Sequence, residues 1–109
     1  MTERRVLWTG PALRDLAAIF EYIAEQQPAT ALRVFARLHA RASQLSAQTL
    51  RGRRVPELHE LGIDSHRELI EAPWRIIYRP ADDRVYIVAV FDARRNVHDV
   101  LTERLLQLR

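Results

Sequence analysis

Residues 66–91 read HRELIEAPWRIIYRPADDRVYIVAVF, and this stretch decides the fold of the chain. Runs rich in β-branched and aromatic residues at 66–71, 74–80 and 84–91 are separated by APW and PADDR, whose composition is typical of turns. Strands joined by such short turns pair with their sequence neighbours, so the stretch predicts an antiparallel meander. The third run is apolar on both faces, which indicates a central strand covered on both sides.

The second of these strands, WRIIYR at 74–79, has one apolar face and one largely basic face, because side chains alternate along a strand. Arg75 and Arg79 lie on the basic face. The sequence leaves three roles open for them: they pair with carboxylates of the fold, bind a phosphate, or lie in solvent. Glu68 and Glu71 on the preceding strand are the candidate partners.

The region before the meander predicts a short strand at 6–8 and two amphipathic helices interrupted at Pro28. Thr9 or Gly10 is expected to cap the first helix, with Pro11 in its first turn. The expected core stripes are Leu13, Leu16, Ala17, Phe20, Ile23 and Ala24 in the first helix, and Leu32, Phe35, Leu38, Ala42 and Leu45 in the second, at 29–47. Because so few residues separate the helices, they should form an antiparallel hairpin.

After the meander, Asn96 is expected to cap a C-terminal helix. The apolar residues of this helix are Val97, Val100, Leu101, Leu105 and Leu108. The element order is therefore β-α-α-β-β-β-α. It predicts a single α+β domain over residues 1–109, with an antiparallel sheet packed against a helical hairpin and followed by a C-terminal helix.

One apolar strip of the first helix lies outside its expected core stripe. It consists of Ala18, Ile19 and Tyr22, which the helical period places on the far side of the helix. An additional apolar strip indicates either a surface for a protein partner or an ordinary surface beside a misjudged core. The sequence leaves both interpretations open.

The composition excludes several kinds of site. The chain has no cysteine, so disulfides and thiolate metal sites are excluded. Its four histidines lack the spacing of a metal site, and no serine lies in a nucleophile motif, so we expect no metal and no cofactor. The longest apolar run is too short for a membrane helix, and the N-terminal segment lacks a signal-peptide core, so we expect a cytoplasmic chain without membrane contact.

Arginines are the remaining candidates for binding. All 17 basic residues are arginine, which follows either from GC-rich codon usage or from the bidentate binding of phosphate and carboxylate by guanidinium. Two groups precede the meander: Arg33, Arg37 and Arg41 on the second helix, and Arg51, Arg53 and Arg54 in the loop after it. The helical stripe is explained either by a solvated surface or by a track for phosphates.

Three segments together resemble the RelE/ParE superfamily of toxins from type II toxin–antitoxin pairs: ALRDLAAIFEYIAEQQPATALRVF, HRELIEAPWRIIYR and VYIVAVFDARRN. The resemblance spans nearly the whole chain. It implies a cognate antitoxin whose C-terminal segment wraps the helical hairpin and the sheet edge. It also implies that the antitoxin carries a ribbon-helix-helix half, through which the complex binds operator DNA. The residues expected to contact the antitoxin are Ala18, Ile19, Tyr22, Arg75 and Arg79.

The superfamily divides by target, since RelE-like members cut mRNA on the ribosome and ParE-like members poison DNA gyrase. For a nuclease, the resemblance implies that Arg67 and Arg75 bind the phosphate and that Arg94 belongs to the same site. Cleaving relatives keep a Tyr or His at the end of the last strand, where this chain has Asp92. A carboxylate that is ionised at neutral pH cannot donate a proton there, and it would repel the phosphate.

The sequence therefore favours a ParE-like toxin that stabilises the cleavage complex of gyrase and DNA without chemistry of its own. Arg94, Arg95 and Arg104, at or after the end of the last strand, are the residues expected to contact this target. Two alternatives stay open: a ribosome-dependent mRNA endonuclease, and an inactive relative that only binds an antitoxin.

Overall fold

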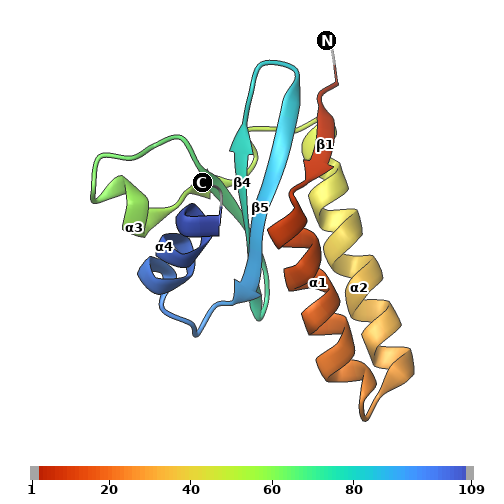
Figure 1. Ribbon diagram of the computed structural model, residues 1–109. Coiled ribbons are helices and arrows are strands. Elements are labelled where there is room, and N and C mark those ends of the chain that lie inside the picture. Colours follow the sequence, from red (N-terminus) through yellow and green to blue (C-terminus); the bar gives the residue numbers. More distant parts are fainter. Residues whose placement is uncertain (1–2, 108–109) are drawn as a thin grey trace.

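The chain folds into three layers, with helices on both faces of one sheet. A computed structural model describes residues 3–107, with side chains up to Arg104. The elements are β1 (Arg5–Trp8), α1 (Gly10–Ala24), α2 (Pro28–Ser43), the 3₁₀ turn η1 (Gln44–Ser46), β2 (Arg53–Arg54), α3 (Pro56–His59), β3 (Arg67–Glu71), β4 (Trp74–Pro80), β5 (Arg84–Asp92) and α4 (Val97–Gln107). Figure 1 shows α1 and α2 on one side of the sheet and α3 and α4 on the other. The predicted α+β class is confirmed.

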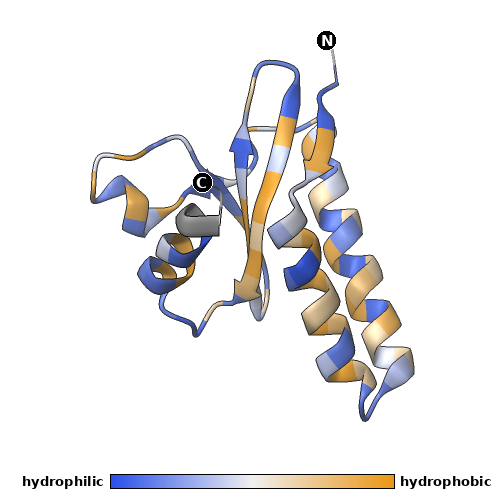
Figure 2. Cartoon of the chain, in the orientation of Figure 1, coloured by the Kyte–Doolittle hydropathy of each residue, from blue (hydrophilic) through white to orange (hydrophobic). Residues whose placement is uncertain are grey.

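The sheet has five strands in the order β1-β5-β4-β3-β2. Strands β3, β4 and β5 form the predicted antiparallel meander, and β1 pairs parallel to β5. The central position predicted for the last strand is confirmed, since β5 lies between β1 and β4 and is apolar along most of its length (Figure 2). Strand β2 and helix α3 were not predicted, because elements of two and four residues carry no readable period.

Each face of the sheet has its own core. The first cluster lies between the sheet and the α1–α2 hairpin and includes Leu38, Ile76 and Tyr78. The second lies between the sheet and α4 and includes Ile77 and Phe91. The predicted alternation of residues 74–79 is confirmed, because Ile76 and Ile77 belong to opposite clusters.

The orientation of the hairpin about its helix axes differs from the prediction. Leu13 and Leu32 were expected in the core but are 52% and 62% exposed. The small residues Ala12 and Ala31 are fully buried in their place. Small side chains let the helices approach closely. Because both stripes are apolar, periodicity alone could not tell them apart.

This rotation also corrects three further expectations. Ala17 was expected in the core but is exposed. Ile19 packs partly against the first core cluster, so its placement on the far side of α1 was wrong. Phe35 was expected in the core but is 41% exposed. Tyr22 is 80% exposed, as expected. The side chain of Leu105 and all of Leu108 lie outside the described residues.

Helices α1 and α4 both begin with the predicted N-cap residues. The Thr9 hydroxyl accepts a hydrogen bond from the N–H of Ala12 at 3.3 Å and donates one to the carbonyl of Ile87 at 3.0 Å. The Asn96 side chain accepts a bond from the N–H of Asp99 at 3.2 Å and so caps α4. Within the described part of the chain, no helix has the length and apolar character needed to cross a membrane.

Candidate functional site

A groove of about 580 Å³ runs between α1 and the end of β5. Ala18, Ile19 and Tyr22 of α1 line one side, and Arg94 and Arg95 line the other side, just after β5. The structure therefore brings the apolar strip predicted to bind an antitoxin next to two of the arginines predicted to bind a target. The sequence placed these two sets on separate elements and gave no sign that they share one groove.

The walls of the groove are largely apolar. Trp74 and Ile23 line it and also pack against the first core cluster, so the groove is an open extension of that core. Phe91, a residue of the second cluster, lines it as well. An apolar surface that continues from a core and stays open is typical of a surface for a partner.

An unpaired strand edge borders the groove. Pairing between β1 and β5 ends at Trp8 and Ile87, so the described residues supply no strand beside the last part of β5. One N–H of this edge, that of Val90, donates instead to the carboxylate of Asp15 at 3.0 Å. The remaining edge can accept a strand from another chain.

Asp15 also links α1 to α4 around this edge. Both of its carboxylate oxygens accept bonds from Nη2 of Arg104, at 2.8 Å and 2.9 Å. The two helices lie on opposite faces of the sheet, so this ion pair joins both helical layers where β1 ends. Arg104, expected to contact a target, is thus engaged within the fold, and its side chain is only 11% exposed.

The carboxylate at the end of β5 is ionised. Asp92 accepts bonds from Nε and Nη2 of Arg94, at 2.9 Å and 2.7 Å, and from the N–H of Arg94 at 2.9 Å. The side-chain bonds from Arg94 lower the pKa of Asp92 to about 2. Asp92 therefore carries no proton to donate at neutral pH, which agrees with the sequence-based expectation.

Arg75, on the basic face of β4, is bound by two carboxylates. Its Nε donates to Glu68 at 2.6 Å, and its Nη1 and Nη2 donate to Glu57 at 3.0 Å and 2.9 Å. The side chain of Glu68 is fully buried and also accepts a bond from Arg53 at 2.6 Å. The hydrogen bonds from Arg75 lower the pKa of Glu57 to about 2. Arg75 thus pairs with carboxylates of the fold.

The sequence identified Glu68 as a partner but missed Glu57, which lies on the unpredicted helix α3. Arg79, the other arginine of this face, lies over the ring of Tyr86, with its Cζ 4.9 Å from the ring centroid. Arg75 and Arg79 are therefore separated by the sheet from Ala18 and Tyr22. The residues expected to bind the antitoxin do not form one surface.

The arginines implied for a nuclease do not converge. Arg67 pairs in register with Tyr78, on the hairpin face, and donates to the carbonyl of Gly52 at 2.8 Å. Arg75 lies on the opposite face, where its Cζ is 5.7 Å from the ring centroid of Phe91. Arg94 is bound to Asp92 at the groove. These positions form no common cluster of cations around one phosphate.

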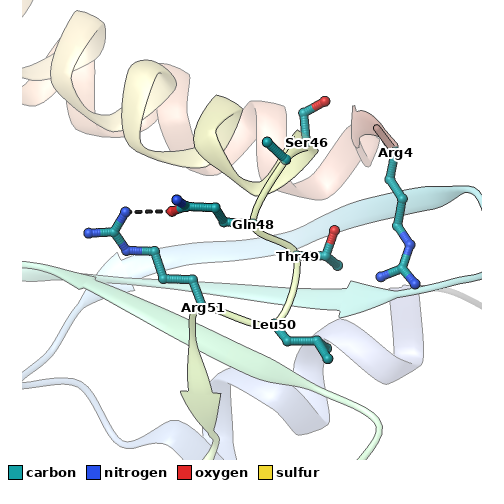
Figure 3. A pocket seen from close by; sticks show the side chains of 7 residues that line it. Arg4, Ser46, Gln48, Thr49, Leu50 and Arg51 are labelled. Atoms are coloured by element: carbon teal, nitrogen blue, oxygen red, sulfur yellow. Dashed lines mark hydrogen bonds between the residues drawn. The ribbon is translucent and has the colours of Figure 1, made fainter. Parts of the chain in front are cut away.

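The loop arginines do not form an anion site either, since Arg53 pairs with Glu68 and Arg54 lies 3.9 Å from Asp64. A shallow hollow of about 740 Å³ lies beside residues 46–51 and Arg4 (Figure 3). Arg4 and Arg51 lie on opposite sides of this segment, and Arg51 donates to Gln48 at 2.7 Å. No group of residues able to hold a metal ion occurs in the described part of the chain.

Comparisons with known proteins show which family the chain resembles. The profile described as "ParE toxin of type II toxin-antitoxin system, parDE" matches residues 6–97. The chain is also 38% identical over 92 residues to Toxin RelE2 of Caulobacter vibrioides, covering 84% of this chain and 97% of that protein.

Two solved structures have a similar fold. The chromosomal ParDE system of P. aeruginosa matches with a TM-score of 0.69 and 20% identity, over 83% of this chain and 96% of that chain. The toxin–antitoxin complex RelBE2 of Mycobacterium tuberculosis matches with a TM-score of 0.60 and 26% identity, over 84% and 93%. The profile match, residues 6–97, takes in every groove residue named above, whereas Arg104 lies beyond it.

Proposed function

Because the chain belongs to the ParE toxin family of type II toxin–antitoxin systems, we propose that it poisons DNA gyrase by stabilising the enzyme's cleavage complex with DNA. The observation that carries this proposal is the Asp92–Arg94 pair. An ionised carboxylate occupies the position where a cleaving relative needs a proton donor, and its own arginine already neutralises it. A toxin that acts by binding needs no such donor.

The cognate antitoxin, in this proposal, neutralises the toxin by filling the groove. The groove offers apolar walls, an open strand edge on β5 and the exposed side chain of Arg95. These features fit a segment that adds a strand to β5, buries apolar side chains against Trp74 and Tyr22, and places an acidic side chain near Arg95. We further propose that the antitoxin has a ribbon-helix-helix half that binds operator DNA, and that the complex acts in the cytoplasm.

Gyrase poisoning is tested with purified toxin, gyrase, ATP and supercoiled plasmid. We expect linear DNA after detergent treatment, because detergent releases the broken strands from a stabilised cleavage complex. The exposed Arg95 is the target contact least engaged within the fold, so Arg95→Glu should lower the yield of linear DNA at least several-fold. Arg84→Glu, the same charge reversal at the far end of β5 and remote from the groove, is the matched control. Intact plasmid at a high ratio of toxin to gyrase would contradict the proposal.

The similarity to Toxin RelE2 supports a second candidate, a ribosome-dependent mRNA endonuclease. Tyr22 lines the groove and is largely exposed, so its phenol is a group that could serve as a proton donor near Arg94. This candidate predicts transcripts cut at fixed codon positions on expression, with cutting lost in Tyr22→Phe and Arg94→Ala. A chain that leaves both plasmid and transcripts intact, and does not arrest growth, would instead be an inactive antitoxin-binding relative.

A further inference from the structure

A second cavity, of about 410 Å³, lies on the opposite face of the sheet from the groove. Its walls come from the sheet, from α4, from α3 at Leu58 and from the segment 63–66 that follows α3. Leu58, Val88 and Leu101 give it a mainly apolar interior. Its volume falls in the range of about 300–1,000 Å³ that is typical of small-molecule sites.

The ionisable groups that line this cavity are basic, apart from the phenol of Tyr86. Arg79 and His66 line it, and among the described residues no carboxylate lies within ion-pair distance of either side chain. Burial and the nearby positive charge of Arg79 lower the pKa of His66. Nδ1 of His66 is 2.8 Å from the hydroxyl of Ser65, which leaves Nε2 available to another partner. The cavity thus joins an apolar interior to a basic group without a counter-ion.

A third basic side chain contributes to the same wall. Arg104 uses Nη2 for its pair with Asp15, whereas its Nε and Nη1 are buried and have no hydrogen-bond partner. A guanidinium group that is only partly compensated favours an anion nearby. No acidic residue lines the cavity in the described part of the chain.

We propose that this cavity binds a small amphipathic carboxylate, such as a medium-chain fatty acid. The apolar chain would lie among Leu58, Val88 and Leu101, because burial there removes it from water. The carboxylate would accept bonds from Arg79 and His66 at the basic end. The site is independent of the gyrase proposal, since it lies on the other face of the sheet from the groove.

Octanoate and octanol form the test pair, because they share an apolar chain and differ in charge. We expect octanoate to raise the melting temperature of the purified chain and to bind at least about tenfold more tightly than octanol by calorimetry. In two-dimensional amide NMR, octanoate should shift signals of Val88, Leu101 and His66, and leave those of Tyr22 unchanged. Equal affinity for the two compounds, or shifts centred on the groove, would overturn the proposal.

Three variants locate the site. Arg79 is exposed and bound to no acid of the described chain, so Arg79→Gln should fold normally and bind octanoate about tenfold more weakly. Arg84→Gln removes the same charge elsewhere on the sheet and should bind as the parent chain does. Ile63→Trp places a large side chain at the partly exposed wall, and octanoate binding should be lost. Parental affinity in Arg79→Gln, or in a folded Ile63→Trp, would contradict the assignment.

Discussion

Arg75 on β4 and Arg94 just after β5 differ in burial and in the position of their counter-ions. On the α4 face, Arg75 is 7% exposed and lies between Glu57 and Glu68. At the groove, Arg94 is 87% exposed and forms an ion pair with Asp92, two residues earlier in the chain. The sequence shows arginine beside β-strand residues in both places. The difference teaches that burial and the position of counter-ions, more than charge pattern, separate arginines that hold the fold from arginines that can meet a partner.

The largest expected effect comes from breaking the buried pair. Arg75→Met would leave the fully buried carboxylate of Glu68 without its buried partner, with only the exposed Arg53 remaining, at a cost of about 3–5 kcal/mol in the free energy of unfolding. Arg94→Met, the matched change at the groove, should leave that free energy nearly unchanged, because water solvates both partners. Urea unfolding of the two variants measures the contrast.

A double variant sharpens this test. In Arg75→Met/Glu68→Leu no buried charge remains, so most of the lost stability should return. The Arg53 side chain, which would lose its partner, is largely exposed and can be solvated by water. Equal losses in Arg75→Met and Arg94→Met would remove the distinction between the two regions.

The sequence alone predicts only part of this difference between Arg75 and Arg94. The meander, the caps at Thr9 and Asn96 and the pairing of Arg75 with Glu68 follow from local pattern and strand register. Glu57 does not, because it comes from a four-residue helix that only tertiary structure places over β4. The hairpin orientation was missed for another reason: both apolar stripes satisfy the helical period, and only contact with the sheet selects one.

The groove was predicted in part. Ala18 and Tyr22 were identified as a surface for a partner, and both line it. Its other wall was assigned to a different ligand, because nothing in the sequence indicates that α1 lies beside the end of β5. The open edge of β5 results from the short length of β1, which ends at Trp8. Such a groove arises from how elements end relative to one another.

The next largest effect is the pH dependence of the stability that Glu57 contributes. The pKa of Glu57 is lowered from 4.5 to about 2 in the fold, so its pairing stabilises the native state fully above about pH 4.5. That contribution is lost as the pH falls from about 4.5 through about 2, because the unfolded chain then binds a proton more readily than the fold does. Urea unfolding of the parent chain and of Glu57→Gln should therefore differ most at neutral pH and converge near pH 2. A difference that stays constant over this range would show that Glu57 acts through packing alone.

The smallest effect on stability, and the sharpest contrast with Arg75, is expected in the groove. Tyr22 is 80% exposed, so Tyr22→Ala should change the free energy of unfolding by no more than about 0.5 kcal/mol. If a partner buries this side chain, the same change should weaken binding of the cognate antitoxin at least about tenfold, since buried tyrosines are common anchors of interfaces. Leu50→Ala, at another exposed residue with a large side chain (62%) on the loop after η1, should leave the affinity unchanged. Calorimetric titration of each variant with the antitoxin decides between the two surfaces. Parental affinity in Tyr22→Ala would show that the groove beside β5 is not where the antitoxin binds.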